Sequence, residues 1–194
     1  LIPHLEAIFK GFPPRPDAAD AKELVERSLQ WVGRLVRSTE GAAKVLHSKD
    51  IMLKLLIFYS IEETNKSALL AIHTLCTKHD DFRAVLLEEH GFAPATFDAF
   101  IRTGKANFMK VYGANAWDDF VNVCASLSAF CSHFPERMEE FMDLIVPLIT
   151  VMKEKTDKAR KNAAVLIAKL SQNENNKKVM QANHGTEVLY SIQN

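Results

Sequence analysis

The histidines and cysteines are the side chains whose spacing most resembles that of a chemical site. His73 and Cys76 lie three residues apart, and His79 follows three residues later. A structural zinc site takes four ligands, however, and no second cluster in the sequence completes the set. Cys76 also continues an apolar stripe at helical spacing, which favours a position in the core. We therefore expect no metal site and no cofactor.

Other catalytic arrangements are not indicated either. Cys131 and His133 could suggest a thiolate–imidazole pair, but residues two apart on a helix face different directions. The glycines are scattered at expected helix ends and form no phosphate-binding loop ahead of a helix. Acidic pairs such as Asp118-Asp119 stand at expected helix starts, where a carboxylate complements the helix dipole. The sequence predicts that the protein is not an enzyme.

Charge and cysteine content narrow the class of protein. The 194 residues carry 24 Lys and Arg against 24 Asp and Glu, so no net charge attracts nucleic acid or an anionic membrane. No apolar run approaches the roughly 20 residues of a membrane span. The odd set of Cys76, Cys124 and Cys131 is typical of a reducing compartment. We expect a cytoplasmic protein that binds neither nucleic acid nor membrane.

Helical periodicity dominates the chain, and no convincing strand pattern is present. Gly91 and Gly185 are expected to end short helices, with Gly185 in the left-handed conformation that glycine adopts at little cost. Two further short helices, one carrying Val179 and Met180 and one starting at Thr186, close the chain. The expected helices before them span residues 1–12, 20–37, 39–47, 51–60, 65–78, 81–90, 94–101, 117–133, 136–142, 144–155 and 157–171.

The longest helices recur at a fixed interval. Their apolar ends are 40 residues apart from Leu35 to Leu75 and again from Phe130 to Leu170, whereas Leu75 to Phe130 is 55 residues. We assign the excess to an insertion, residues 104–117, which we expect to be a loop. A period of this length with three helices per unit predicts an all-α protein, a right-handed armadillo- or HEAT-like solenoid of stacked three-helix repeats.

The repeat boundaries follow from this period. One solenoid over residues 1–194 is predicted, with full repeats at 39–78, 79–133 and 134–172 and the insertion inside the second. Partial repeats, 1–38 and 173–194, stand at the two ends. Because the chain begins inside a repeat, we expect the natural protein to extend further toward its N-terminus.

The segment KARKNAAVLIAKLSQNENNKKVMQANHGTEVLYSI resembles the armadillo family: an Ala-rich third helix, a polar loop with Asn, a short helix, then glycine and an apolar helix. More narrowly, it is similar to the C-terminal armadillo region of a family that carries tetratricopeptide repeats upstream. No tetratricopeptide motif occurs in this chain.

That resemblance implies a protein-interaction module. Its role would be the client-binding part of a cytoplasmic assembly factor or co-chaperone for axonemal dyneins, in the cytoplasm or the cilium. The implied partners are dynein chains or other assembly factors. One alternative is a structural scaffold subunit of a ciliary or cytoskeletal complex. Another is the armadillo domain of a myosin-type chaperone, to which the chain is more weakly similar.

The armadillo resemblance also implies a peptide-binding groove lined by third helices. In the importin and catenin groups an Asn there holds the peptide, but the matching positions here are Arg34, Thr74, Ala129 and Lys169. Binding of nuclear localisation signals is therefore not expected. Arg34 and Lys169, together with Lys78, would give this groove a mildly basic surface for an acidic segment of a client. The alternative is that these are ordinary solvated charges on helix surfaces.

The predicted insertion offers a second candidate surface. It contains Phe108, Tyr112 and Trp117, the kind of aromatic side chains that anchor protein interfaces. The same residues could instead fix a long loop to its own solenoid. The sequence leaves both alternatives open.

Overall fold

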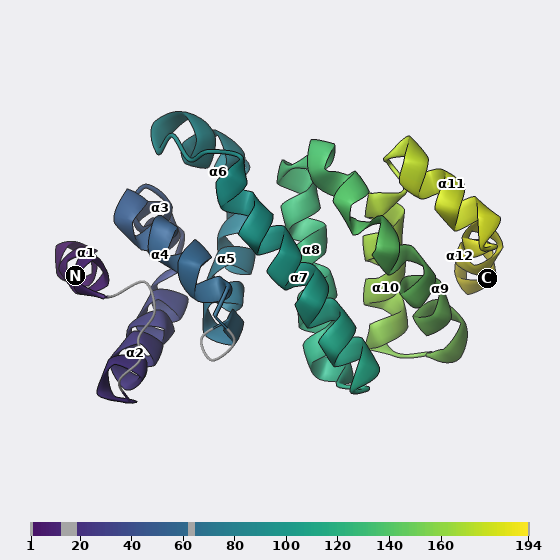
Figure 1. Ribbon diagram of the computed structural model, residues 1–194, viewed down its shortest axis with the longest axis horizontal. Helices are drawn as coiled ribbons and strands as arrows, with labels where there is room; N and C mark the ends of the chain where they lie inside the picture. Colours follow the sequence, from purple (N-terminus) through teal and green to yellow (C-terminus); the bar gives the residue numbers. More distant parts are fainter. Residues whose placement is uncertain (1, 13–18, 62–64, 194) are drawn as a thin grey trace. The chain divides into compact units, whose positions relative to one another are not determined.

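The computed structural model describes residues 2–12, 19–61 and 65–193. Every element in these ranges is a helix and none is a strand, so the prediction of an all-α protein is confirmed (Figure 1). None of the described helices is both long and apolar enough to span a membrane. The chain forms two compact units, Leu1–Thr103 and Gly104–Asn194, which we call unit 1 and unit 2.

Unit 1 is built from pairs of packed helices. Helix α5 packs against α2, α3 and α4, and α1 packs against α4. A turn of π-helix, η1, follows α6, and the first part of α7 completes the unit. The helices are α1 (Ile2–Gly11), α2 (Ala19–Leu35), α3 (Thr39–Leu46), α4 (Lys49–Tyr59), α5 (Asn65–Lys78), α6 (Phe82–Ala84), η1 (Val85–Glu89) and α7 (Ala95–Gly113).

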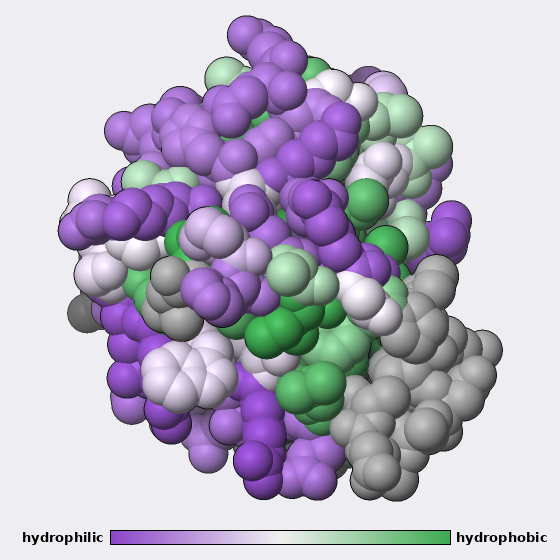
Figure 2. All heavy atoms as spheres, turned by 90° about the vertical axis from the view of Figure 1, so that its left-hand side faces the viewer, coloured by the Kyte–Doolittle hydropathy of each residue, from purple (hydrophilic) through white to green (hydrophobic). Residues whose placement is uncertain are grey.

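Apolar stripes of these helices meet in a core rich in phenylalanine. Phe9 and Phe58 are fully buried, with ring centroids 6.1 Å apart between α1 and α4. Tyr59 lies 4.4 Å from the ring of Phe100 on α7. Seen from the α1 side, the surface is mostly hydrophilic, with one compact hydrophobic area near its centre (Figure 2). The polar surface and aromatic interior are those of an ordinary folded unit.

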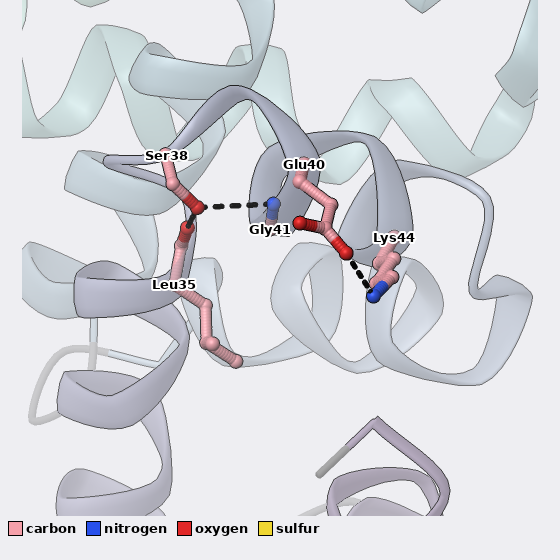
Figure 3. A network of polar contacts seen from close by, with 5 residues as sticks. All are labelled: Leu35, Ser38, Glu40, Gly41 and Lys44. Carbon is pink, nitrogen blue, oxygen red and sulfur yellow. Dashed lines mark hydrogen bonds and ion pairs between the residues drawn. The ribbon is translucent and has the colours of Figure 1, made fainter.

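Serine caps mark the starts of two helices in unit 1. The Ser38 hydroxyl accepts a hydrogen bond from the Gly41 amide at 3.1 Å and donates one to the Leu35 carbonyl at 3.1 Å (Figure 3). One turn into α3, Lys44 pairs with Glu40 at 2.5 Å. Ser48 accepts from the Ile51 amide in the same way at the start of α4. Such caps satisfy backbone donors that a helix start leaves without partners.

Unit 2 is arranged around α10. This helix packs against α8 and α9, while α11 and α12 pack against each other and against α9. Its buried residues include Ala159 and Ala163, which follow the helical spacing of one apolar stripe. The helices are α8 (Trp117–His133), η2 (Pro135–Leu144), α9 (Ile145–Glu154), α10 (Lys158–Leu170), α11 (Glu174–Ala182) and α12 (Gly185–Gln193), with η2 a 3-10 helix.

One buried polar side chain joins three elements of unit 2. Asn176 on α11 has an exposed fraction of 0%. Its amide donates to the Met138 carbonyl of η2 at 2.7 Å and to the Leu170 carbonyl at the end of α10 at 3.2 Å. Buried carbonyls need such partners, so Asn176 fixes where the chain turns from α10 into α11.

The expectation of a loop at residues 104–117 is wrong for most of that segment. Helix α7 continues to Gly113, and α8 begins at Trp117. Phe108 is fully buried and lies 5.2 Å from the Phe120 ring, measured between centroids. The burial of this side chain outweighs the low helix propensity of the neighbouring glycines and asparagines.

Two other local expectations differ from the structure. At the turn before α12 the left-handed residue is His184, with a φ of 60°, and not Gly185. A Cβ at Gly185 would lie 2.5 Å from Met180 Cγ and 2.9 Å from Ile149 Cδ1, so glycine is required there by close packing. Gly91 has a φ of 65° and does end its helix as predicted. The segment expected as a short helix at 136–142 is the 3-10 helix η2.

Candidate protein-interaction face

Two hydrogen bonds fix helices α2 and α5 side by side. Ser67 donates to Glu26 at 2.7 Å, and the Lys78 amino group donates to the Arg37 carbonyl. Both bonds join residues 41 apart in the sequence. An equal offset at two places means that the helices run in the same direction, with residue i of α2 level with residue i+41 of α5.

Large apolar side chains lie exposed along these two helices. The exposed fractions are 49% for Leu24, 51% for Trp31 and 56% for Leu70. By the register above, Leu70 is level with residue 29 and therefore close in height to Trp31. We call the surface formed by Leu24, Trp31, Arg34, Leu70, Thr74 and Lys78 the α2–α5 face.

A cation lies over the most prominent aromatic ring of this face. The Arg34 guanidinium carbon is 5.3 Å from the centroid of the Trp31 ring, within the range of a cation–π contact. Arg34 itself is exposed, so its donors can still reach an acceptor from outside. Tryptophan and arginine are the residue types most enriched among side chains that dominate interface energies.

Two predicted site residues on this face have hydrogen bonds within unit 1. The Thr74 hydroxyl donates to the Leu70 carbonyl at 2.8 Å, one turn back along α5. Lys78 is held by the Arg37 carbonyl, although its side chain is exposed. Lys78 therefore positions α5 against α2, and Arg34 carries the charge that is free to meet a partner.

Lys169 is not part of this face. It lies on α10 in unit 2, where it is half-buried and its positive charge acts on the Cys131 thiol. The structure thus groups Arg34, Thr74 and Lys78 and leaves Lys169 in a different unit.

The aromatic residues of the predicted insertion mainly pack within unit 2. Phe108 is fully buried and stacks on Tyr112 with 6.2 Å between ring centroids. Trp117 packs edge-on against Phe120 at 5.5 Å, and Lys155 lies 4.2 Å above the Trp117 ring. These contacts support the self-packing alternative, in which the aromatic side chains hold the segment to its own unit.

The histidine and cysteine side chains considered as metal ligands or catalytic groups do not come together in one site. No group of three His, Cys, Asp or Glu side chains suited to a metal ion occurs among the described residues. All three cysteines are buried, and none of them forms a disulfide. Burial raises the pKa values of the Cys76 and Cys124 thiols above their usual range. Burial also raises the pKa of the Cys131 thiol to about 12, although the positive charge of Lys169 acts to lower it. Burial also lowers the pKa of His73. These thiols are core residues.

Sequence reasoning missed the exposed apolar residues of the α2–α5 face. The helical period of apolar residues in α2 would include Leu24 in the inner stripe, but the buried stripe runs through Val25, Leu29 and Val32 and leaves Leu24 exposed. The sequence does contain a signal for this surface. Leu24 and Trp31 are large apolar residues seven positions apart, and each directly precedes a residue of the buried stripe, Val25 or Val32. A large apolar pair at heptad spacing beside a complete core stripe indicates a second apolar edge.

Comparison of the chain with protein-family models, with curated proteins and with solved structures found no match.

Proposed function

We propose that the chain is a protein-interaction module of armadillo type and that its α2–α5 face binds an acidic, partly apolar segment of a client protein. The observation that carries the proposal is the half-exposed Trp31, which lies under Arg34, with Leu24 exposed on the same helix and Leu70 exposed on the adjacent helix α5. An apolar group of this size on a surface otherwise made of charged helices is typical of a binding site.

The energy available from this face is sufficient for a specific contact. A tryptophan presents about 250 Å² of surface, so covering its exposed half removes about 125 Å² from water and contributes about 3 kcal/mol. Leu70 would add a further contribution of about 1 kcal/mol on the same scale. An acidic side chain that reached Arg34 would add a charge-assisted hydrogen bond.

The armadillo interpretation draws support from how the helices follow one another. The three-helix order with a long last helix occurs at α3–α4–α5 and again at η2–α9–α10. The parallel contact of α2 with α5 is what stacked repeats of about 40 residues would give. The resemblance noted in the sequence adds the client class, axonemal dynein chains. The alternative is a fixed scaffold subunit of a ciliary or cytoskeletal complex.

Binding of dynein heavy chain from a cytosolic extract of ciliated cells tests the proposal. Trp31→Ser should weaken binding of the heavy chain about a hundredfold and Leu70→Ser about fivefold, in line with about 3 and about 1 kcal/mol, and neither should lower the free energy of unfolding. Leu53→Ser on α4 is the matched control, because Leu53 is also an exposed leucine but lies outside the face. Equal recovery by all three variants would contradict binding through this face. Stoichiometric recovery of the chain with salt-washed axonemes would favour the scaffold role.

A further inference from the structure

Unit 2 contains an open groove, none of whose lining residues belongs to the α2–α5 face. It has a volume of about 530 Å³ and runs between α10 and α12. Along α10 its floor consists of Ala164, Val165 and Ala168, and its wall on α12 consists of Leu189 and Ile192. Val165 has an exposed fraction of 50%. The groove therefore has an apolar floor made mostly of small side chains.

The other side of α10 shows how neighbouring helices pack against this helix. Helix α10 packs on α8 and on α9. On its other side α12 packs on α9 and α11, and the groove separates it from α10. Alanine side chains let a helix axis approach closely, because the distance between packed helices depends on the residues at the contact. The lining of small and apolar side chains therefore suits the packing of one amphipathic helix.

The charged residues of α10 indicate what kind of partner helix would bind in the groove. Helix α10 carries Lys158, Arg160, Lys161 and Lys169 and has no acidic residue in its first turn. Three of these cations stand where the helix dipole is already positive, an arrangement that is unfavourable without a negative partner. None of the four forms an ion pair with a described residue, and the Arg160 Nε is buried without a hydrogen-bond partner.

The one carboxylate in the groove lining is already engaged. Asp157 accepts a hydrogen bond from the Ala159 amide at 2.8 Å as the cap of α10. The end of the groove at Arg160 and Lys161 thus combines positive side chains with the positive end of the helix dipole. It is complementary to carboxylates.

We propose that the groove between α10 and α12 is a docking site for an amphipathic helix of a partner protein, with leucine-type side chains on Val165 and Leu189 and carboxylates beside Arg160 and Lys161. The site is independent of the α2–α5 face, since every residue that forms it belongs to unit 2.

The test uses the whole chain and a fluorescein-labelled model helix. The helix carries leucines at positions i, i+4, i+7 and i+11 and glutamates in its first turn; a control helix has lysines in place of the glutamates. Fluorescence polarisation should show saturable binding of the acidic helix and at least tenfold weaker binding of the basic one. The methyl resonances of Val165, Leu189 and Ile192 should shift on binding.

Two protein variants locate the site. Arg160→Glu with Lys161→Glu should weaken binding of the acidic helix at least tenfold. Lys177→Glu with Lys178→Glu on α11 changes the net charge equally outside the groove lining and should change binding less than twofold. Ala168→Trp fills the floor at an exposed position and should abolish binding while circular dichroism stays unchanged.

Several results would overturn the proposal. These are equal binding of the acidic and basic helices, unchanged binding by the Arg160 and Lys161 double variant, or methyl shifts confined to residues outside the groove. Concentration-dependent dimerisation that Ala168→Trp removes would identify a second copy of this chain as the occupant instead. Trp31→Ser should leave binding to the groove unchanged, so failure here is distinguishable from failure at the α2–α5 face.

Discussion

Replacement of Asn176 by alanine should destabilise unit 2 more than any other change of a single polar side chain on α11. The substitution removes the Nδ2 donor that lies 2.7 Å from the Met138 carbonyl oxygen and 3.2 Å from the Leu170 carbonyl oxygen. The Leu170 carbonyl keeps a second hydrogen bond, from the Asn173 amide at 3.1 Å, so the main loss falls on Met138. Each buried carbonyl left without a partner costs about 1–3 kcal/mol. The Oδ1 atom of Asn176 has no hydrogen-bond partner among the described residues, and its removal offsets part of that loss.

The expected net effect of Asn176→Ala is a loss of about 1–3 kcal/mol in the free energy of unfolding. The neighbouring Asn175 provides the matched control. It also bonds to η2, through Glu139 at 3.0 Å, but it does so at the surface. Asn175→Ala should therefore cost less than about 0.5 kcal/mol.

Equilibrium unfolding in urea, followed by circular dichroism at 222 nm and by near-ultraviolet signals, measures both variants. The slope of free energy against urea concentration should stay constant, so that the midpoint reports stability directly. If the two alanine variants lowered the free energy of unfolding by the same amount, the burial argument for Asn176 would be refuted. Asn176→Asp extends the test, since a carboxylate facing two carbonyl oxygens should be less stable than alanine, and increasingly so as pH rises from about 4 to about 7.

Three further predictions concern caps, glycines and thiols. Ser38→Ala should cost about 1 kcal/mol, measured by urea unfolding, because the Gly41 amide loses its acceptor. Gly33→Ala should raise the free energy of unfolding by about 0.5–1 kcal/mol, since Gly33 is helical with no atom within 4 Å of an added Cβ. Gly41→Ala should lower the free energy of unfolding, because the added Cβ would lie 2.2 Å from the Leu35 carbonyl oxygen. At pH 8 the Cys131 thiol, with its pKa raised to about 12, should react with a disulfide reagent at least about 10³-fold more slowly in the folded protein than in urea; rapid labelling of the folded chain would contradict its burial.

Local sequence signals were sufficient to place most helices. Ser48 and Asp157 stand as caps where polar residues precede an apolar stripe, and both accept hydrogen bonds from the following backbone. The buried stripe of α10 through Ala163 and Leu166 follows directly from the 3.6-residue period. These features depend on residues within a few positions of one another, and for that reason a single sequence contains them.

Features that depend on distant neighbours could not be predicted in this way. The helical state of residues 104–113 relies on burial of Phe108 against Phe120, a contact that glycine content in the segment concealed. The exposed position of Trp31 depends on which side of α2 receives α5, and periodicity alone does not fix that side. The repeat boundaries and the armadillo assignment stay predictions.

The offset of hydrogen bonds in unit 1 has a consequence for how the chain folds. Three hydrogen bonds between side chains of different described helices or helix ends join partners about one period apart: Glu6 with Ser48, Glu26 with Ser67 and His47 with Glu89 are 41 or 42 residues apart. Closing a chain segment of that length carries a moderate and nearly constant entropic cost at every step. Folding can therefore start at any one pair of helices and extend by adding the next.

In such a chain the order of assembly is set by which neighbouring pair is most stable. The end helix α1, which packs on α4, is then expected to exchange its amide hydrogens faster than α5, which is covered by α2, α3 and α4. A mutation would slow folding mostly through the pair of helices that contains it, and more distant helices would assemble at their own rates.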